Sequence, residues 1–277
     1  MLRHAKPTSA GKRNRIDFIA EGLHKGKPER SLLAVGHFKR QGRGYLGKVT
    51  VPHRGGGVKK RLRLIDWRRD KHEVEAVVAR IEYDPMRSSN LALLYYRDGE
   101  KRYILAPVGL KAGDIVMAGK RVEPRPGNAM PLKNIPVGMP IHNLELQPGR
   151  GAKLVKGAGA HALIQSKEGR YVTVQLPSRE QRLILAECFA TIGQVGNQEW
   201  KNRILGKAGR KRMMGIRPTV RGTAQDPRSN PHGGGEGRSG VGLKYPKTAW
   251  GRPVAPGTKT RNIKKSRKWL VKSRGAK

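Results

Sequence analysis

Hydrophobic and polar positions alternate through the middle of this chain. Val74, Ala76 and Val78 are separated by charged or exposed positions, and Ile81 and Tyr83 continue the apolar series. A period of two places one set of side chains on a buried face and the other set on an exposed face, as in a β-strand. We therefore expect a strand across this segment.

A hairpin is predicted directly after that strand. The apolar runs from Leu91 to Tyr96 and from Lys101 to Leu105 flank an Asp98-Gly99 pair. Glycine supplies the positive φ that a tight hairpin turn requires, so Asp-Gly between two apolar runs is a strong signal for two antiparallel strands.

A second group of short strands is expected after residue 150. The candidates are Lys153 to Val155, His161 to Ser166, Tyr171 to Leu176, Arg182 to Leu185 and Cys188 to Ile192. Glycines and a Pro-Ser pair separate several of them. Many short strands divided by such turns are typical of a small barrel or a sandwich.

The order of these segments predicts a mainly β chain with two consecutive small barrels. The proline-rich segment from Glu123 to Pro140 has little periodicity and indicates a joint, with a boundary near Pro131. Helix is scarce, and one short helix is expected around Glu199 to Leu205. The predicted domains are a basic N-terminal extension over 1–60, a barrel over 61–130, a barrel over 131–200 and a basic, Gly/Arg-rich C-terminal extension over 201–277.

The charge of the chain points to a polyanionic partner. Lys and Arg number 59 against 20 Asp and Glu, a formal net charge of +39 on 277 residues. Residues 1–60 hold 15 basic and 3 acidic residues, and residues 201–277 hold 22 and 2. Such a surplus binds phosphates, because the counterions released from them drive association. No run approaches the roughly 18 apolar residues of a membrane-spanning helix, and the polar extensions are expected to order on the partner.

The sequence gives little indication of a metal site or of a disulfide. Cys188 is the only cysteine, so the chain can form no internal disulfide and no Cys-based zinc site. It lies in an apolar run and is expected to be a buried thiol. The isolated histidines His72, His142 and His161 are interpreted as strand or turn residues.

Two clusters combine glycine with cations. In the first, His53-Arg54-Gly55-Gly56-Gly57 precedes Lys59, Lys60, Arg61 and Arg63. Backbone N–H groups of such a loop can meet phosphates, although the spacing of a nucleotide-binding phosphate loop is absent. The second holds Lys207, Arg210, Lys211, Arg212, Arg217 and Arg221 among glycines. Arginine forks bind phosphate oxygens and stack on bases, so we expect a strand threading through folded RNA. A solvated basic tail is the alternative, but such a tail would give the apolar side chains of Met213, Met214, Ile216 and Trp250 nothing to pack against.

His232 stands before Gly233-Gly234-Gly235-Glu236. An imidazole near a carboxylate suggests acid–base chemistry or a metal site. However, a glycine triplet does not hold ligands rigidly, and no nucleophile or pocket is indicated. We therefore predict that His232 stacks on a base or donates to a phosphate. The aromatic residues of the first barrel are either stacking platforms or core, with core favoured: Trp67, Tyr95, Tyr96 and Tyr103.

Several motifs occur together in a specific order. They are His53 to Gly57, Ile81-Glu82-Tyr83-Asp84-Pro85, Asp98 to Pro107, Gly196-Asn197, Leu205 to Arg210, Arg217 to Gly222 and Pro231 to Gly237. Together they resemble the family of the universal second protein of the large ribosomal subunit, in its bacterial type, from about Lys6 to Arg261. The chain departs from that family's usual residues at Trp200, Met213 and Gln225 to Asn230. Because the resemblance begins near Lys6, we expect no transit peptide in the chain.

The resemblance implies an OB-fold barrel, then an SH3-like barrel, with long basic, irregular extensions at both ends. It also implies binding to large-subunit rRNA, support of subunit assembly and a bridge to small-subunit rRNA. Neighbouring ribosomal proteins are further expected partners. By the same resemblance His232 lies near the peptidyl transferase centre, as a support to an RNA active site.

We predict a structural ribosomal protein of the bacterial cytoplasm, with no enzymatic activity, cofactor, bound metal, membrane association or homo-oligomer. The residues predicted to bind RNA are Arg54, Gly55, Gly56, Gly57, Lys59, Lys60, Arg61, Arg63, Arg68, Arg69, Arg87, Lys201, Lys207, Arg210, Lys211, Arg212, Arg217, Arg221 and His232. Two alternatives remain. An enzyme acting on RNA would need clustered acids, metal ligands or a cofactor loop, and a DNA-compacting protein would bind duplex DNA as well as RNA.

Overall fold

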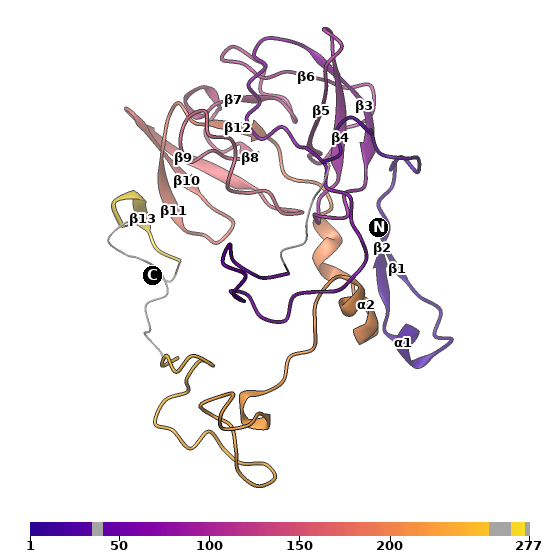
Figure 1. The fold of residues 1–277 in the computed structure, drawn as a ribbon. Helices are drawn as coiled ribbons and strands as arrows, with labels where there is room; N and C mark the ends of the chain where they lie inside the picture. The colour runs from indigo at the N-terminus through magenta and orange to yellow at the C-terminus, as the bar shows by residue number, and fades with distance from the viewer. Residues whose placement is uncertain (35–40, 255–266, 275–277) are drawn as a thin grey trace. The chain divides into compact units, whose positions relative to one another are not determined.

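The computed structural model describes residues 1–34, 41–254 and 267–274 (Figure 1). The chain forms two compact units. Unit 1 comprises Met1–Phe38, Lys59–Lys207 and Trp269–Lys277, and unit 2 comprises Lys39–Val58 and Ala208–Lys268. Unit 2 is therefore built from two segments that lie far apart in the sequence, one from each predicted extension.

The first sheet has four strands in the order β5-β4-β3-β6. They are β3 (Ala76–Glu82), β4 (Leu91–Tyr96), β5 (Lys101–Leu105) and β6 (Ile115–Val116). The predicted hairpin is confirmed: β4 pairs with β5 antiparallel, and Gly99 in the turn has a φ of 85°.

Strand β4 is apolar without interruption because both of its faces are covered. Leu94 packs into one hydrophobic cluster of this barrel, whereas Leu93 packs into another cluster around Tyr103. Tyr103 and Tyr96 are core residues, as favoured from the sequence, whereas Tyr95 is exposed. A strand buried on both faces shows no alternation in its sequence.

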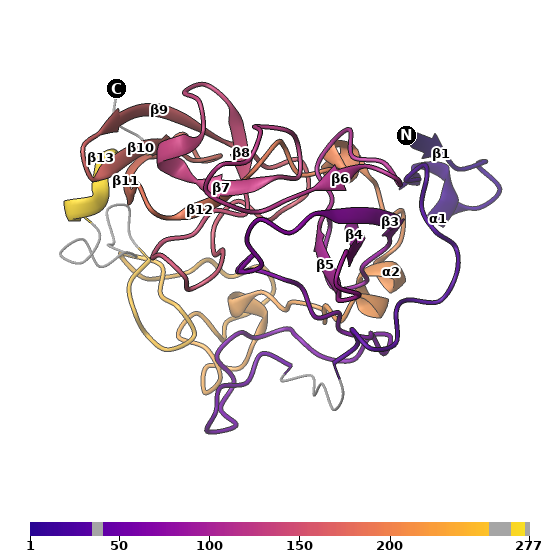
Figure 2. The ribbon, with the colours of Figure 1, turned by 90° about the horizontal axis from the view of Figure 1, so that it is seen from above.

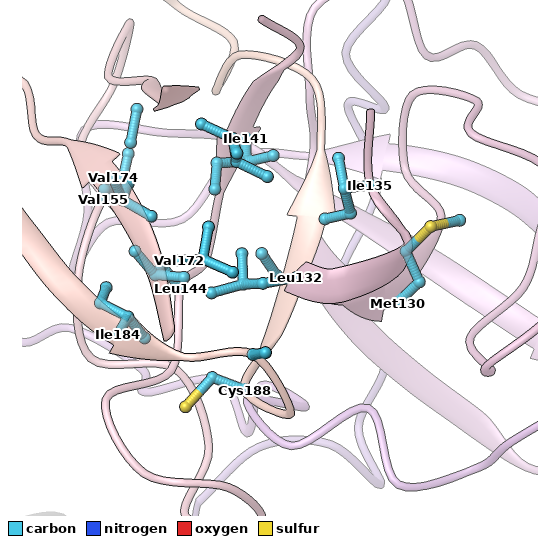
Figure 3. Packing of buried hydrophobic residues seen from close by; sticks show 14 of the residues in the cluster. Met130, Leu132, Ile135, Ile141, Leu144, Val155, Val172, Val174, Ile184 and Cys188 are labelled. Carbon is cyan, nitrogen blue, oxygen red and sulfur yellow. The ribbon is translucent and has the colours of Figure 1, made fainter. Parts of the chain in front are cut away.

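The second sheet has seven strands in the order β13-β11-β10-β9-β8-β12-β7. They are β7 (Ala129–Pro131), β8 (Pro140–His142), β9 (Ala162–Glu168), β10 (Tyr171–Gln175), β11 (Gln181–Leu185), β12 (Phe189–Ile192) and β13 (Leu270–Lys272). The sheet curls around an apolar core that includes Leu132, Ile141 and Val172 (Figure 3). Cys188 belongs to this core, where burial raises the pKa of its thiol to about 12. The architecture is mainly β, with an OB-fold barrel followed by an SH3-like barrel.

Three local predictions need correction. No strand forms over Lys153 to Val155, where Leu154 makes only an isolated bridge to Leu144. The helix expected around Glu199 to Leu205 is the 3-10 helix η2 (Gln198–Asn202). The segment expected as a bare joint supplies β7, η1 (Leu132–Asn134) and β8, because its apolar side chains pack into the second core.

The remaining elements lie in the predicted extensions. They are β1 (Leu2–His4), α1 (Ala10–Arg13), β2 (Ile16–Phe18), α2 (Ala208–Met213), η3 (Gly222–Ala224) and η4 (Arg267–Trp269). Helix α2 lies in a segment that the sequence predicts to be irregular, but alanine, lysine and arginine are good helix formers and its single glycine does not prevent a short helix. Both ribbon views show β13, from the C-terminal extension, beside β11 (Figures 1 and 2). No helix in the described ranges is long and apolar enough to span a membrane.

Candidate nucleic-acid interface

Within unit 2, the two Gly/Arg clusters form one antiparallel pair. The backbone N–H of Gly55 donates to the Gly215 carbonyl oxygen at 3.0 Å, and that of Arg217 donates to His53 at 3.0 Å. Arg54 forms an antiparallel bridge with Ile216. Segments 53–58 and 213–217, which the sequence presents as separate motifs, are therefore one local structure.

The close approach of these two segments explains one of the three glycines. A Cβ on Gly57 would lie 2.6 Å from the Gly215 nitrogen and 2.7 Å from the Met213 carbonyl oxygen, and the φ of Gly57 is +76°. A side chain is thus excluded both by backbone atoms and by conformation. Gly56 differs, because a Cβ there would meet no atom within 4 Å.

A cavity of about 490 Å³ lies between the paired segments. Its lining consists of Gly55, Gly56, Gly57, Val58, Arg212, Met213 and Arg217. Two guanidinium groups and exposed glycine backbone face it, and its lining holds no carboxylate. The two arginine forks are suited to phosphate oxygens, and the glycines leave room for a phosphate to approach the backbone.

The cations around this cavity have no acidic partner. Within the ranges that the structure describes, Arg54, Lys211, Arg212, Arg217 and Arg221 form no ion pair. All five are exposed. Their charge is consequently available to a polyanion.

Many cations of the first barrel are held by internal pairs instead. Arg102 contacts Asp66, Asp70 and Glu100, and Lys71 contacts Asp98 and Glu100. The hydrogen bond from Arg102 lowers the pKa of Asp70 and that of Glu100. These arginine and lysine side chains serve the fold of the barrel and contribute less to an external field.

A smaller group of cations surrounds Trp67. The Arg87 guanidinium lies 5.1 Å and the Lys156 Nζ 4.3 Å from the ring centroid. Arg87 also pairs with the buried Asp84 at 2.5 Å, so its position is fixed. Lys156 is a candidate that the sequence analysis missed. A single lysine in a Gly-rich loop carries no distinctive pattern, and only the fold brings it to the tryptophan.

Two predicted arginines are not at the surface. Arg69 is only 2% exposed, and its Nη2 lies 3.3 Å from the Gly127 carbonyl oxygen. Arg63 is 9% exposed, and its Nη1 donates to the Arg61 carbonyl oxygen at 3.0 Å. Their guanidinium groups are directed at backbone carbonyls of unit 1, so we leave both out of the interface. The other predicted cations of unit 1 are exposed or half-buried: Lys59, Lys60, Arg61, Arg68, Lys201 and Lys207.

His232 is held inside unit 2 by its own loop. The backbone N–H of Lys247 donates to the His232 Nε2 at 2.7 Å, and the His232 N–H donates to the Asn230 Oδ1 at 2.9 Å. Because Nε2 accepts, the neutral ring carries its proton on Nδ1, which remains a donor. Gly233 lies so close to Asp226 that a Cβ would be 2.4 Å from its carbonyl oxygen. Gly233 thus permits close packing, and the hydrogen bond from Lys247 holds the imidazole.

No group of three potential metal ligands occurs among the described residues. The geometry thus offers cationic donors for phosphates, and one fixed imidazole.

Comparison with known families agrees with this chemistry. Residues 29–118 match the family model of Ribosomal Proteins L2, RNA binding N-terminal domain, and residues 125–251 match that of Ribosomal Proteins L2, C-terminal domain. The two matches span most of the chain. The family is structural and RNA-binding, not enzymatic, which removes the RNA-enzyme alternative. The protein is thus a component of the large ribosomal subunit, with rRNA and ribosomal proteins as partners. The chain belongs to the ribosomal protein L2 family.

Proposed function

We propose that the unit 2 cavity and the exposed cations beside it bind phosphates of large-subunit rRNA. The antiparallel pairing of segments 53–58 and 213–217 carries this proposal, because it joins two basic clusters in a place without carboxylates. The proposed contacts of unit 2 are Arg54, Gly55, Gly56, Gly57, Arg210, Lys211, Arg212, Arg217, Arg221 and His232. Those of unit 1 are Lys59, Lys60, Arg61, Arg68, Arg87, Lys201 and Lys207.

Finer roles follow from the resemblance between about Lys6 and Arg261. We propose that the protein supports large-subunit assembly and subunit association through small-subunit rRNA. His232 would support the peptidyl transferase centre without taking part in the chemistry. A bacterial cytoplasmic ribosome and the absence of self-association belong to the same proposal. The domain boundaries at residues 60, 130 and 200 stay predictions.

The salt dependence of rRNA binding tests the phosphate contacts. Each phosphate contact contributes about one unit to the slope of log K against log salt. We expect Arg212→Ala and Arg217→Ala in the full chain each to lower that slope by about one unit. Arg97→Ala is the matched control, because it also removes one charge but Arg97 is paired with Glu75 on the surface.

Two outcomes would contradict the proposal. One is a slope that changes no more in the two cavity variants than in the control. The other is duplex DNA competing as well as the rRNA does, which would favour the DNA-compacting alternative.

A conservative substitution can separate the proposed role of the His232 imidazole in peptide-bond formation from the hydrogen bond that it accepts from Lys247. In His232→Gln, the amide oxygen can replace Nε2 as acceptor for the Lys247 N–H, but the amide NH2 does not lie at the position of the Nδ1 donor. We expect this variant to keep the hydrogen-exchange protection of the Lys247 amide. Peptide-bond formation in reconstituted particles should nevertheless be as slow as with His232→Ala. Full recovery of the rate in His232→Gln would show that His232 acts only through its loop.

A further inference from the structure

A second cationic cavity lies in unit 1, on the SH3-like barrel. Its volume is about 380 Å³, within the range of roughly 300–1,000 Å³ typical of ligand sites. Its lining includes Arg150, Lys153, Arg182 and Trp269. None of them was predicted from the sequence as an RNA contact.

The loop that carries Arg150 is held by a buried carboxylate. Glu145 is 1% exposed, and its oxygens accept from the backbone N–H groups of Gly151 at 2.8 Å and of Phe189 at 3.1 Å. It also accepts from Gly149 at 3.3 Å. These bonds hold the backbone of the loop, whereas the Arg150 side chain is exposed. The position of this cation is therefore set by the fold.

The opposite side of the cavity is formed by the C-terminal strand. Strand β13 pairs with β11, with Leu270 opposite Arg182. The preceding residue, Trp269, is thereby placed in the cavity lining, with its ring centroid 5.7 Å from that of Tyr171. An aromatic surface and three cations thus converge from three different segments.

The charged residues that line this cavity are all cationic. Its lining contains no Asp or Glu. Among the residues described by the structure, Arg150, Lys153 and Arg182 take part in no ion pair. A neighbouring hollow, which Arg150 also lines, differs because Asp66, Asp70 and Glu100 line it together with its cations. The charges that line the cavity of the second barrel are thus all positive.

We propose that this cavity binds one unstacked nucleotide of rRNA, with its base on Trp269 and its phosphate among Arg150, Lys153 and Arg182. Arginine and lysine satisfy phosphate oxygens, and an aromatic ring accepts the face of any base. An acidic protein segment would satisfy the cations but would make no use of a flat ring. The inference depends on rRNA being the partner of the family and not on the proposed contacts of unit 2.

Binding of the full chain to large-subunit rRNA tests this site. We expect the double variant Arg150→Ala/Arg182→Ala to lower the salt slope by about two units. Trp269→Leu should weaken binding roughly 5- to 150-fold at fixed salt, whereas Trp269→Phe should retain most of the affinity. Arg170→Ala is the control, because Arg170 is an exposed cation of the same barrel that does not line the cavity. Circular dichroism identifies any variant that loses its fold.

Ultraviolet cross-linking of the unaltered complex provides a measurement that needs no variant. We expect a nucleotide adduct on the peptide Trp269 to Lys272. The proposal is overturned if that peptide carries no nucleotide, or if the cavity variants bind rRNA like the Arg170→Ala control. A cross-link of this peptide to another ribosomal protein would also overturn it. Because the unit 2 variants report on other residues, failure here leaves the proposed function intact.

Discussion

His142 offers a quantitative test of the packing in unit 1. It lies in β8 and is fully buried, with its Nδ1 2.8 Å from the Gly193 carbonyl oxygen. The Nδ1–H therefore donates, and the Nε2 has no hydrogen-bond partner among the described residues. Burial lowers the pKa of His142 from 6.5 to about 4, and the charge of Arg69 acts in the same direction. The folded protein thus holds this imidazole neutral.

The lowered pKa makes stability depend on pH. Below pH ~6.5 the unfolded chain binds a proton that the folded chain excludes until the pH approaches about 4. Stability is therefore greatest above pH ~6.5 and falls as the pH decreases. The pKa of His142 differs by about 2.5 between the unfolded and folded chain, which corresponds to about 3 kcal/mol of unfolding free energy. About 2.5 kcal/mol of that free energy is lost between pH ~7.5 and ~4.5.

Urea denaturation of the full chain, followed by circular dichroism at several pH values, measures this loss. His142→Asn is the comparison, because its amide N–H can still donate to Gly193 but does not titrate. Carboxylates with a lowered pKa, such as Asp70 and Asp98, affect both proteins alike and act mainly below their ordinary value of 3.8. We expect the stability difference between the two proteins to shift by about 2.5 kcal/mol over the interval. Parallel pH profiles would refute the buried, neutral His142.

Three further substitutions test other parts of the fold. Tyr103→Phe should cost about 1–3 kcal/mol of unfolding free energy, because the buried Glu82 carboxylate loses the 2.7 Å bond from the tyrosine hydroxyl; a denaturation midpoint equal to the parent's would contradict this. Gly57→Ala should lower the melting temperature and weaken rRNA binding, whereas Gly56→Ala should affect folding less, because only the former places a Cβ against backbone atoms. Asn197→Ala should cost at least about 1 kcal/mol, since Asn197 has a φ of 63° and its amide bonds to the first barrel; unchanged stability to urea would exclude that role.

The sequence by itself determined the features that depend on neighbouring residues. The β4–β5 hairpin follows from two apolar runs around Asp98-Gly99, because the turn conformation and the strand pattern are local. The buried thiol of Cys188 follows from the apolar run around it. Net charge is a sum over composition, so the polyanionic partner needed no structure. The ordered series of motifs was sufficient for the family, which the comparisons confirm.

Only the tertiary structure decided which cations are available. A sequence cannot distinguish the buried Arg69 from the exposed Arg217, because the guanidinium of Arg69 is buried against the carbonyl oxygen of Gly127, which is 58 residues away. Nor can it show that segments 53–58 and 213–217 pair, or that Trp269 comes to lie beside Arg182 through β13. These arrangements arise from backbone hydrogen bonds between distant segments. Such bonds depend on the path of the whole chain and leave no periodic pattern in the residues that make them.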